Sequence, residues 1–523
     1  MDSQEETLMK KKQIITMALM AVLLIAMAAG YMVFKGYQED KLAREEEQEE
    51  KEDTIPLFEM NSDDINEISY TYNGETTDMV SKDDIWIMKG TDRPMNSSYI
   101  DDIKSAMSSV VAIKVITEDT SNPAEYGLDD ESVTLSYRVS CSDGTAHTLK
   151  FGIKVTTEDS AYYAMVDDDK KIYSMSANYY DILEYSLAEM TEIVDDVGIN
   201  SDYITEVDVK SKDNGEFSAR YFGDNADNGY YTWEITRPYK NVLADTDKWK
   251  AMLTKYGSME LKKCVAFGTD DYSEYGLDDP EATIRLKYYT VTGVEEEDSG
   301  DTDDVSSEDS SASATPVPEE QREYDELTLY ISEPQTEGEE TFFYVRPEGS
   351  SNVYTMDSDA QGLYAFTPFE VADVCIYSKL IDQIKGYDVE FGDKKLVIER
   401  RDEEPEATAE PGSVPKKKDT INVYYANGKK VEEDDALNLY SFAYLLTYSG
   451  EADKNKADDS DIPALTITYH PVEGEDVVVK YMPYDGANFY HVDKNGMNYF
   501  LTDKRGIDTL IKNYEEFIEK NSL

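Results

Sequence analysis

Cysteine and histidine are scarce in this chain, and their spacing excludes two common kinds of site. The three cysteines, Cys141, Cys264 and Cys375, lie far apart and form no C-x-x-C motif. An odd number of scattered cysteines does not make a disulfide framework, and zinc sites need several His or Cys ligands at short spacing. His147 and His470 lie on strand-like segments, where we expect surface or hydrogen-bonded histidines. The sequence therefore predicts no metal site and no cofactor.

Motifs for the common catalytic chemistries are missing as well. The chain contains no G-x-S-x-G, no H-E-x-x-H and no P-loop. These motifs place a serine nucleophile, a catalytic zinc and a nucleotide phosphate, respectively. We therefore expect that the protein is not an enzyme.

Basic residues are few: 50 stand against 111 acidic ones, giving a formal net charge of −61. A charge of this sign repels phosphate backbones, which excludes nucleic-acid binding. The acidity is typical of a solvated surface with acidic linkers. Cation binding is the alternative, but no EF-hand loop is present, and Asp493–Gly496 reads better as a hairpin turn.

Long hydrophobic runs are limited to one, which predicts a membrane anchor. Residues 13–34 carry no charge and follow three lysines. A helix of this length reaches about 33 Å, enough to cross a hydrocarbon core of about 30 Å. The positive-inside rule places residues 1–12 in the cytoplasm and the remainder outside the cell, beyond an acidic spacer at 35–56. A signal peptide cleaved near Ala26–Ala28 is the alternative.

What the chain does contain is an internal repeat. The hexamer EYGLDD occurs at Glu125–Asp130 and again at Glu274–Asp279. In each copy a Trp-bearing strand and a helical segment precede it, and strands with alternating apolar residues and a short helical tail follow it. A third, divergent copy lacks the hexamer but keeps the order of elements. We predict an α+β fold with a single N-terminal transmembrane helix followed by three tandem, similar antiparallel-sheet-plus-helix domains.

The predicted repeat domains span residues 57–198, 199–377 and 378–523. Two inserts interrupt them, an acidic one at 294–323 in the second domain and a loop at 401–419 in the third. The acidic insert has no aromatic residue and cannot bury enough apolar area to offset its chain entropy. We therefore predict that it is a disordered excursion between two strands.

The repeated hexamer has a catalytic and a structural interpretation. Its carboxylates could act as general acid and base, but such groups must face each other across a cleft, which sequence neighbours rarely do. In the structural interpretation the Tyr and Leu anchor a turn on the core, Gly permits a positive φ, and the acids bond nearby backbone. We favour the structural one, a clip between helix and sheet. The candidate residues are Glu125, Tyr126, Gly127, Leu128, Asp129, Asp130, Glu274, Tyr275, Gly276, Leu277, Asp278 and Asp279.

Two segments, EYGLDDESVTLSY and EYGLDDPEATIRL, follow the predicted anchor, and the hairpin YYAMV…IYSMS comes after the first of them. Together these features resemble the domain of unknown function 4340 family. Domains of that family are bacterial, often anchored and often repeated. The family has no settled activity, so the resemblance implies no catalytic residue. Some members are encoded beside ABC-transporter components, which implies a membrane-protein partner.

These observations predict a membrane-anchored extracytoplasmic binding or scaffolding protein, an accessory to an ABC-type transporter. The alternative is a cell-surface adhesin or glycan-binding protein, because 41 tyrosines could supply stacking faces for sugars. Most of these tyrosines lie on predicted strands, where they more often pack in the core or across strands. The oligomeric state, the ligand and any binding of cations by the acidic surface stay open.

Overall fold

The computed structural model describes residues 54–129, 133–156, 160–167, 169–181, 183–223, 231–292, 318–403, 421–453, 455–456 and 458–523. The predicted membrane anchor at 13–34 and its flanking segments lie outside the described residues. Within the described ranges, every helix is too short or too polar to span a bilayer. The chain divides into two compact units: Met1–Val194 with Lys263–Gly268, and Asp195–Lys262 with Thr269–Leu523.

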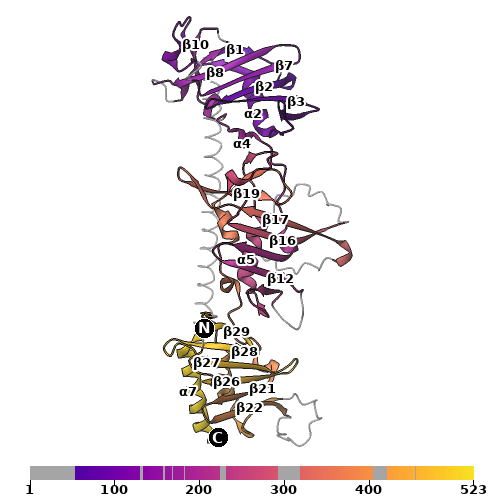
Figure 1. Ribbon diagram of the computed structural model, residues 1–523, viewed down its shortest axis with the longest axis vertical. Helices are drawn as coiled ribbons and strands as arrows, with labels where there is room; N and C mark the ends of the chain where they lie inside the picture. Colours follow the sequence, from indigo (N-terminus) through magenta and orange to yellow (C-terminus); the bar gives the residue numbers. More distant parts are fainter. Residues whose placement is uncertain are drawn as a thin grey trace, which may run out of the picture. The chain divides into compact units, whose positions relative to one another are not determined.

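The first unit contains an eight-stranded sheet in the order β4-β3-β2-β7-β8-β9-β10-β6, and every adjacent pair is antiparallel (Figure 1). Two further strands, β1 and β5, pair with each other. The bounds are Ile55–Glu59 (β1), Ile65–Tyr72 (β2), Glu75–Lys82 (β3), Ile85–Met88 (β4), Ser109–Ala112 (β5), Lys114–Thr117 (β6), Leu135–Cys141 (β7), Ala146–Lys154 (β8), Ala161–Val166 (β9) and Ile172–Ser176 (β10).

The second unit contains two more antiparallel sheets. The second sheet of the chain runs β14-β13-β12-β11-β16-β17-β19-β20, and β18 pairs with β19. Its bounds are Ile204–Ser211 (β11), Gly215–Tyr221 (β12), Trp233–Arg237 (β13), Val242–Leu243 (β14), Ala282–Val291 (β16), Arg322–Ile331 (β17), Gln335–Glu337 (β18), Glu340–Pro347 (β19) and Val353–Asp357 (β20). Strand β15 (Cys264–Ala266) belongs to the first unit.

The third sheet runs β24-β23-β22-β21-β26-β27-β28-β29-β25. Its bounds are Ile384–Phe391 (β21), Lys394–Glu403 (β22), Ile421–Ala426 (β23), Lys429–Val431 (β24), Gly450–Glu451 (β25), Leu465–Pro471 (β26), Val477–Pro483 (β27), Phe489–Lys494 (β28) and Met497–Asp503 (β29). The predicted turn at Asp493–Gly496 connects β28 to β29, with Asn495 and Gly496 at positive φ.

Seven strands of each sheet follow one order, namely β4-β3-β2-β7-β8-β9-β10, β13-β12-β11-β16-β17-β19-β20 and β23-β22-β21-β26-β27-β28-β29. All three sheets also share one irregularity. The register shifts by one residue near the start of the first central strand, after Ile65 in β2, Ile204 in β11 and Ile384 in β21. A bulge of this kind admits one extra residue and is a designed feature of a strand pair rather than a defect. The shared bulge fixes which residues of the three sheets are equivalent, and it identifies the three sheets as copies of one unit.

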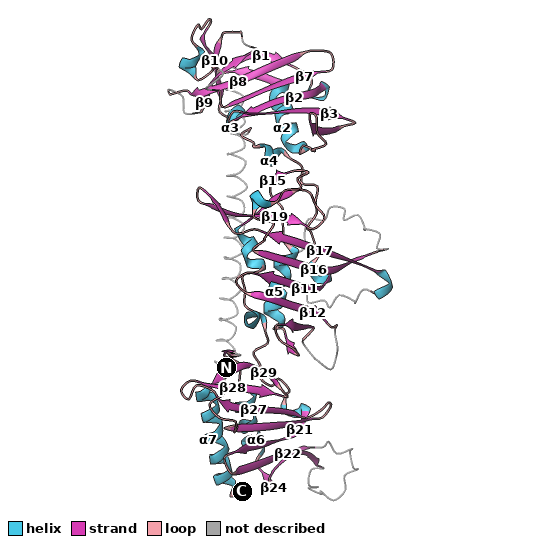
Figure 2. Ribbon diagram, in the orientation of Figure 1, coloured by secondary structure: helices cyan, strands magenta, loops and turns pink. Residues whose placement is uncertain are grey.

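One amphipathic helix in each copy packs on its sheet. These helices are α2 (Ser97–Ser108), α5 (Thr246–Gly257) and α6 (Glu433–Tyr444). Each buries residues three or four apart, such as Trp249, Met252 and Tyr256 in α5; this spacing forms one apolar stripe. Figure 2 shows α6 and the C-terminal helix α7 (Lys504–Asn521) along the third sheet.

The helical tails predicted at 177–190 in the first copy and 359–374 in the second are not continuous helices. The first is two short helices, α3 (Asn178–Asp181) and α4 (Leu187–Met190), and the second is two 3-10 turns, η6 (Ser358–Leu363) and η7 (Pro368–Val371). In the first tail the hydroxyl of Tyr70 donates to Leu183 O and accepts from Tyr185 N, which uses backbone groups that a continuous helix needs. In the second, Pro368 lacks the N–H required inside a helix. The third copy alone closes with a long helix.

Two other predicted boundaries also need correction. The helical pattern before the first hexamer covers residues 97–113, but the helix ends at Ser108 and Ser109–Ala112 forms β5. The β-branched residues Val110 and Val111 favour a strand there. Both inserts are shorter than predicted at the ends that the structure describes. Arg322 and Glu323 pair with β16, and Arg401–Glu403 extend β22. In each case an arginine lies over a tyrosine ring and supports the strand end.

Candidate functional site

The two hexamers adopt the same local structure. Each begins in a 3-10 turn, η2 (Pro123–Tyr126) or η4 (Ser273–Tyr275), that ends on a glycine in the left-handed region: φ is 68° at Gly127 and 67° at Gly276. A side chain at either glycine would be strained, because only glycine adopts this conformation without steric penalty. The glycine therefore has a backbone role in both copies.

The apolar residues of each hexamer contact the sheet, but the leucine is the buried anchor. Leu128 and Leu277 are each 3% exposed, whereas the tyrosines before the glycines are only half-buried. Tyr126 meets Tyr163 edge to face with ring centroids 5.1 Å apart, and Tyr275 meets Tyr344 at the same separation. Of the two predicted anchors, the leucine is therefore buried and the tyrosine is only partly buried.

The acidic residues of the hexamers make local contacts. Glu125 accepts from Asn122 within its own turn at 2.9 Å, and Asp279 pairs with Lys212 at 3.1 Å. Glu274 and Asp278 are exposed. Asp129 has a buried Oδ1 without a hydrogen-bond partner among the described residues, and Asp130 lies outside them. Where described, these carboxylates are placed as turn residues; the clip itself stays a prediction.

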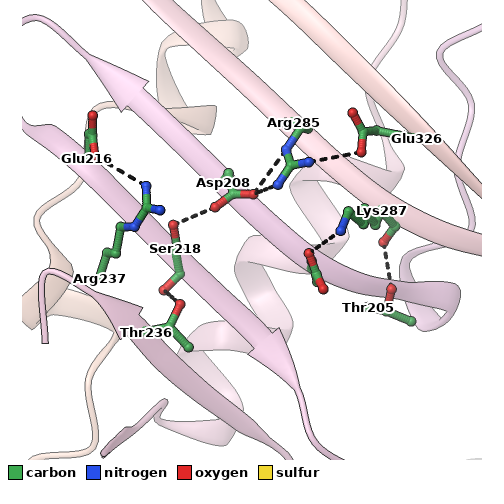
Figure 3. A network of polar contacts seen from close by, with 10 residues as sticks. Thr205, Asp208, Glu216, Ser218, Thr236, Arg237, Arg285, Lys287 and Glu326 are labelled. Carbon is green, nitrogen blue, oxygen red and sulfur yellow. Dashed lines mark hydrogen bonds and ion pairs between the residues drawn. The ribbon is translucent and has the colours of Figure 1, made fainter. Parts of the chain in front are cut away.

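The central strands of the second sheet carry a polar ladder on their open face (Figure 3). Arg285 donates through Nε to Asp208 at 3.1 Å and through Nη1 to Glu326 at 3.0 Å. Lys287 pairs with Glu206 at 2.8 Å, and Ser218 donates to Asp208. The hydrogen bond to Asp208 raises the pKa of the Arg285 guanidinium. The ladder satisfies its own charges and presents a flat polar surface.

The third sheet places an acidic residue at the equivalent position and a histidine beside it. Asp388 follows the β21 bulge as Asp208 follows the β11 bulge. His470 Nε2 lies 3.3 Å from Asp388, and its Nδ1 lies 3.0 Å from Asp476. Burial acts to lower the pKa of His470, but hydrogen bonds to Asp476 and Asp388 outweigh it and raise the pKa. Histidine at this position is therefore hydrogen-bonded, as the sequence predicts.

Two hollows in the surface lie beside the helices α5 and α6. The first, which we call the second-sheet groove, has a volume of about 310 Å³. It is lined by the turn η3 (Ser201–Tyr203), strands β12, β13, β16 and β17, and helix α5. Its aromatic lining consists of Tyr221, Trp233, Trp249 and Tyr289. Trp233 and Trp249 pack together with ring centroids 5.4 Å apart, and Tyr221 is 37% exposed. Buried rings form the base of the groove and tyrosines its accessible wall.

A hollow of about 460 Å³ occupies the corresponding place on the third sheet, and we call it the third-sheet groove. It is lined by η8 (Ile381–Gln383) with Leu380, by β23 and by α6. Tyr424 of β23 lines this groove and pairs with Arg400 on the neighbouring strand β22. Trp233 of β13 pairs with Tyr221 of β12 in the same way. The same three elements, the entry turn, the third strand and the helix, therefore build a groove in two copies.

The grooves were not predicted from the sequence, although the sequence contains a partial signal for one of them. Two of the three tryptophans in the chain line the second-sheet groove. They lie on a strand and a helix, where apolar periodicity alone predicts that they are core residues. Across the described residues, no cluster of three or more His, Cys, Asp or Glu side chains is arranged to hold a metal ion.

Residues 86–224 and 233–454 match the domain of unknown function family DUF4340. The chain belongs to this family. The two matched segments begin at or beside the Trp-bearing strands of the first and second copies, so the family domain recurs within the chain. No curated protein and no solved structure matches the chain.

Proposed function

We propose that this DUF4340 protein is a membrane-anchored extracytoplasmic binding or scaffolding protein without catalytic activity, an accessory to an ABC-type transporter. Residues 13–34 would anchor it, and three tandem domains, 57–198, 199–377 and 378–523, would form the part outside the cell. The charge asymmetry around residues 13–34 supports this orientation.

The recurrence of one groove at equivalent places on two sheets carries the proposal. Both the second-sheet and the third-sheet groove are bounded by the entry turn, the third strand and the helix of their copy. Binding sites are typically concave, with aromatic walls and a few polar groups. Two such sites on one chain suit a partner that is engaged at two points, since linked sites raise the effective concentration of the second contact.

A cell-surface glycan-binding protein is the second candidate function. The observation that favours it is the aromatic lining of the second-sheet groove, where Tyr221 and Tyr289 combine with threonine hydroxyls from several elements. An aromatic face with hydrogen-bonding groups around it suits a ring that is apolar on one face and polar at its edge. Polysaccharide or cell-wall genes beside the gene would favour this candidate, and transporter genes the first.

Fractionation and site-specific crosslinking test the main proposal. The protein is expected in the membrane fraction, and protease added to intact cells should remove everything beyond about residue 38. A photocrosslinker should label a transporter subunit in intact cells when it replaces Lys250, an exposed residue of the second-sheet groove, or Tyr444 of the third-sheet groove. A full-length soluble protein in the medium, or crosslinks equal to those from a position on the polar ladder such as Lys287, would contradict the proposal.

A further inference from the structure

The charge of the second-sheet groove differs from that of the chain around it. Its charged lining residues are Lys250 and Arg322 against one acid, Asp202, in a sequence with more than twice as many acids as bases. Lys250 is exposed and lines the groove. A cation at the edge of a concave site attracts an anionic group.

The groove also holds an unpaired hydrogen-bond donor. The indole Nε1–H of Trp249 is buried and has no acceptor among the described residues, while the side chain itself is 1% exposed and lines the groove. A buried donor left without a partner is unfavourable, and native structures rarely leave one without a water or a ligand to satisfy it. The Trp249 donor therefore requires an oxygen acceptor that the described residues do not supply.

The accessible wall is aromatic. Tyr221 packs on Trp233 with ring centroids 5.9 Å apart and remains 37% exposed. The face of an aromatic ring is electron-rich, so it favours the weakly positive C–H groups on one face of a pyranose. A volume of about 310 Å³ lies near the lower end for ligand sites, which are about 300–1,000 Å³, and suits a single sugar unit of a longer chain.

We propose that the second-sheet groove binds an acidic saccharide of the uronic-acid class. One sugar ring packs on Tyr221, a ring or hydroxyl oxygen accepts from Trp249 Nε1–H, and the carboxylate pairs with Lys250. This inference rests on the glycan-binding candidate above and names the ligand class for one of the two grooves.

The third-sheet groove supplies an internal control. Its charged lining residues are Asp382 and Glu433, with no lysine or arginine among its lining residues. Two carboxylates repel a uronate. The two grooves share their bounding elements but differ in charge, so the proposal predicts that an acidic saccharide binds at the second sheet and not at the third.

Tryptophan fluorescence tests the proposal on the full chain. Trp86 is the single tryptophan outside the groove, so a Trp86→Phe chain reports only on Trp233 and Trp249. A galacturonate trisaccharide should change its emission saturably, and the matching neutral galactose trisaccharide should bind about tenfold more weakly or worse. Calorimetric titration of the unmodified chain gives a second reading that does not depend on the variant.

Three substitutions sharpen the test. Lys250→Glu should weaken galacturonate binding at least tenfold, Trp249→Phe should weaken it while keeping the ring, and Tyr444→Ala in the third-sheet groove should leave it unchanged. Equal binding of the neutral trisaccharide, no binding of either sugar, or unchanged affinity in Lys250→Glu would each overturn the inference. If no sugar binds while crosslinks to a transporter subunit persist, this inference fails and the main proposed function stands.

Discussion

Tyr275 meets Tyr344 edge to face, with ring centroids 5.1 Å apart and planes at 81°. The contact joins the hexamer of the second copy to β19, and Tyr126 with Tyr163 reproduces it in the first copy. Both tyrosines of the hexamers remain half-exposed, while the leucine two residues later is buried. The repeated hexamer is thus a turn held on its sheet by a buried leucine, with a tyrosine contact beside it.

Leucine substitutions in the hexamer should destabilise the fold more than tyrosine substitutions. Leu277→Ala should lower the free energy of unfolding by about 2–5 kcal/mol, the range for removing a buried leucine. Tyr275→Phe keeps the ring contact and should change it by less than about 1 kcal/mol. Denaturant unfolding followed by tryptophan emission measures both. A larger loss in Tyr275→Phe than in Leu277→Ala would mean that the tyrosine hydroxyl, and not the leucine, holds the turn.

Gly152 in the first copy is required because backbone and side-chain atoms of the hexamer lie close to it, and not because of its φ. A Cβ on Gly152 would lie 2.0 Å from Tyr126 O and 2.9 Å from the Leu128 side chain. Backbone cannot move aside cheaply, so Gly152→Ala should destabilise the protein by roughly 1–3 kcal/mol or more, the range for overpacking. Gly450→Ala is the matched control, because a Cβ there meets nothing within 4 Å. Equal melting temperatures for the two variants would contradict the contact.

Some of this could be predicted from the sequence, because it depends on local rules. Alternating apolar residues such as Ile284 and Leu286 predict strands, and a glycine after a short turn predicts positive φ. The residue-by-residue equivalence between the copies could not be predicted. If the first two copies are aligned on their hexamers without a gap, the strand that follows is misplaced by two residues. Such an alignment matches Tyr288 with Val139, whereas the shared bulge matches it with Cys141. The grooves could not be predicted either, since their walls come from elements far apart in sequence.

The polar ladder should contribute little to stability despite its short distances. Asp208 and Arg285 are 30% and 38% exposed at their side chains, so water screens the pair. A double-mutant cycle with Asp208→Asn and Arg285→Gln should give a coupling energy of about 0.2–1 kcal/mol, smaller in high salt. Coupling well above that range, or independent of salt, would show that the ladder is more rigid and less solvated than its exposure indicates.

Removal of the acidic insert should leave the second sheet intact. Strands β16 and β17 pair up to Val291 and Arg322, and Thr292 N donates to Gln321 O beyond them. Replacing residues 293–320 with a two-residue Asn-Gly turn closes this hairpin directly. Because loop-closure entropy changes by only about 0.6 kcal/mol per doubling of length, the melting temperature should stay the same or rise slightly. A large fall would show that residues 293–320 pack on the fold.

His470 should make the stability of the third sheet depend on pH. Its carboxylate partners raise its folded-state pKa above the unfolded value of about 6.5. The proton is therefore held more tightly in the folded chain, so the stabilisation is complete below about pH 6.5 and is lost as pH rises through the folded pKa. The difference in unfolding free energy between the native chain and His470→Gln, measured between about pH 5 and 9, should shrink with rising pH. Asp476→Asn removes the partner at 3.0 Å and should reduce that pH dependence, whereas a difference that grows with pH would mean that the neutral imidazole is the stabilising form.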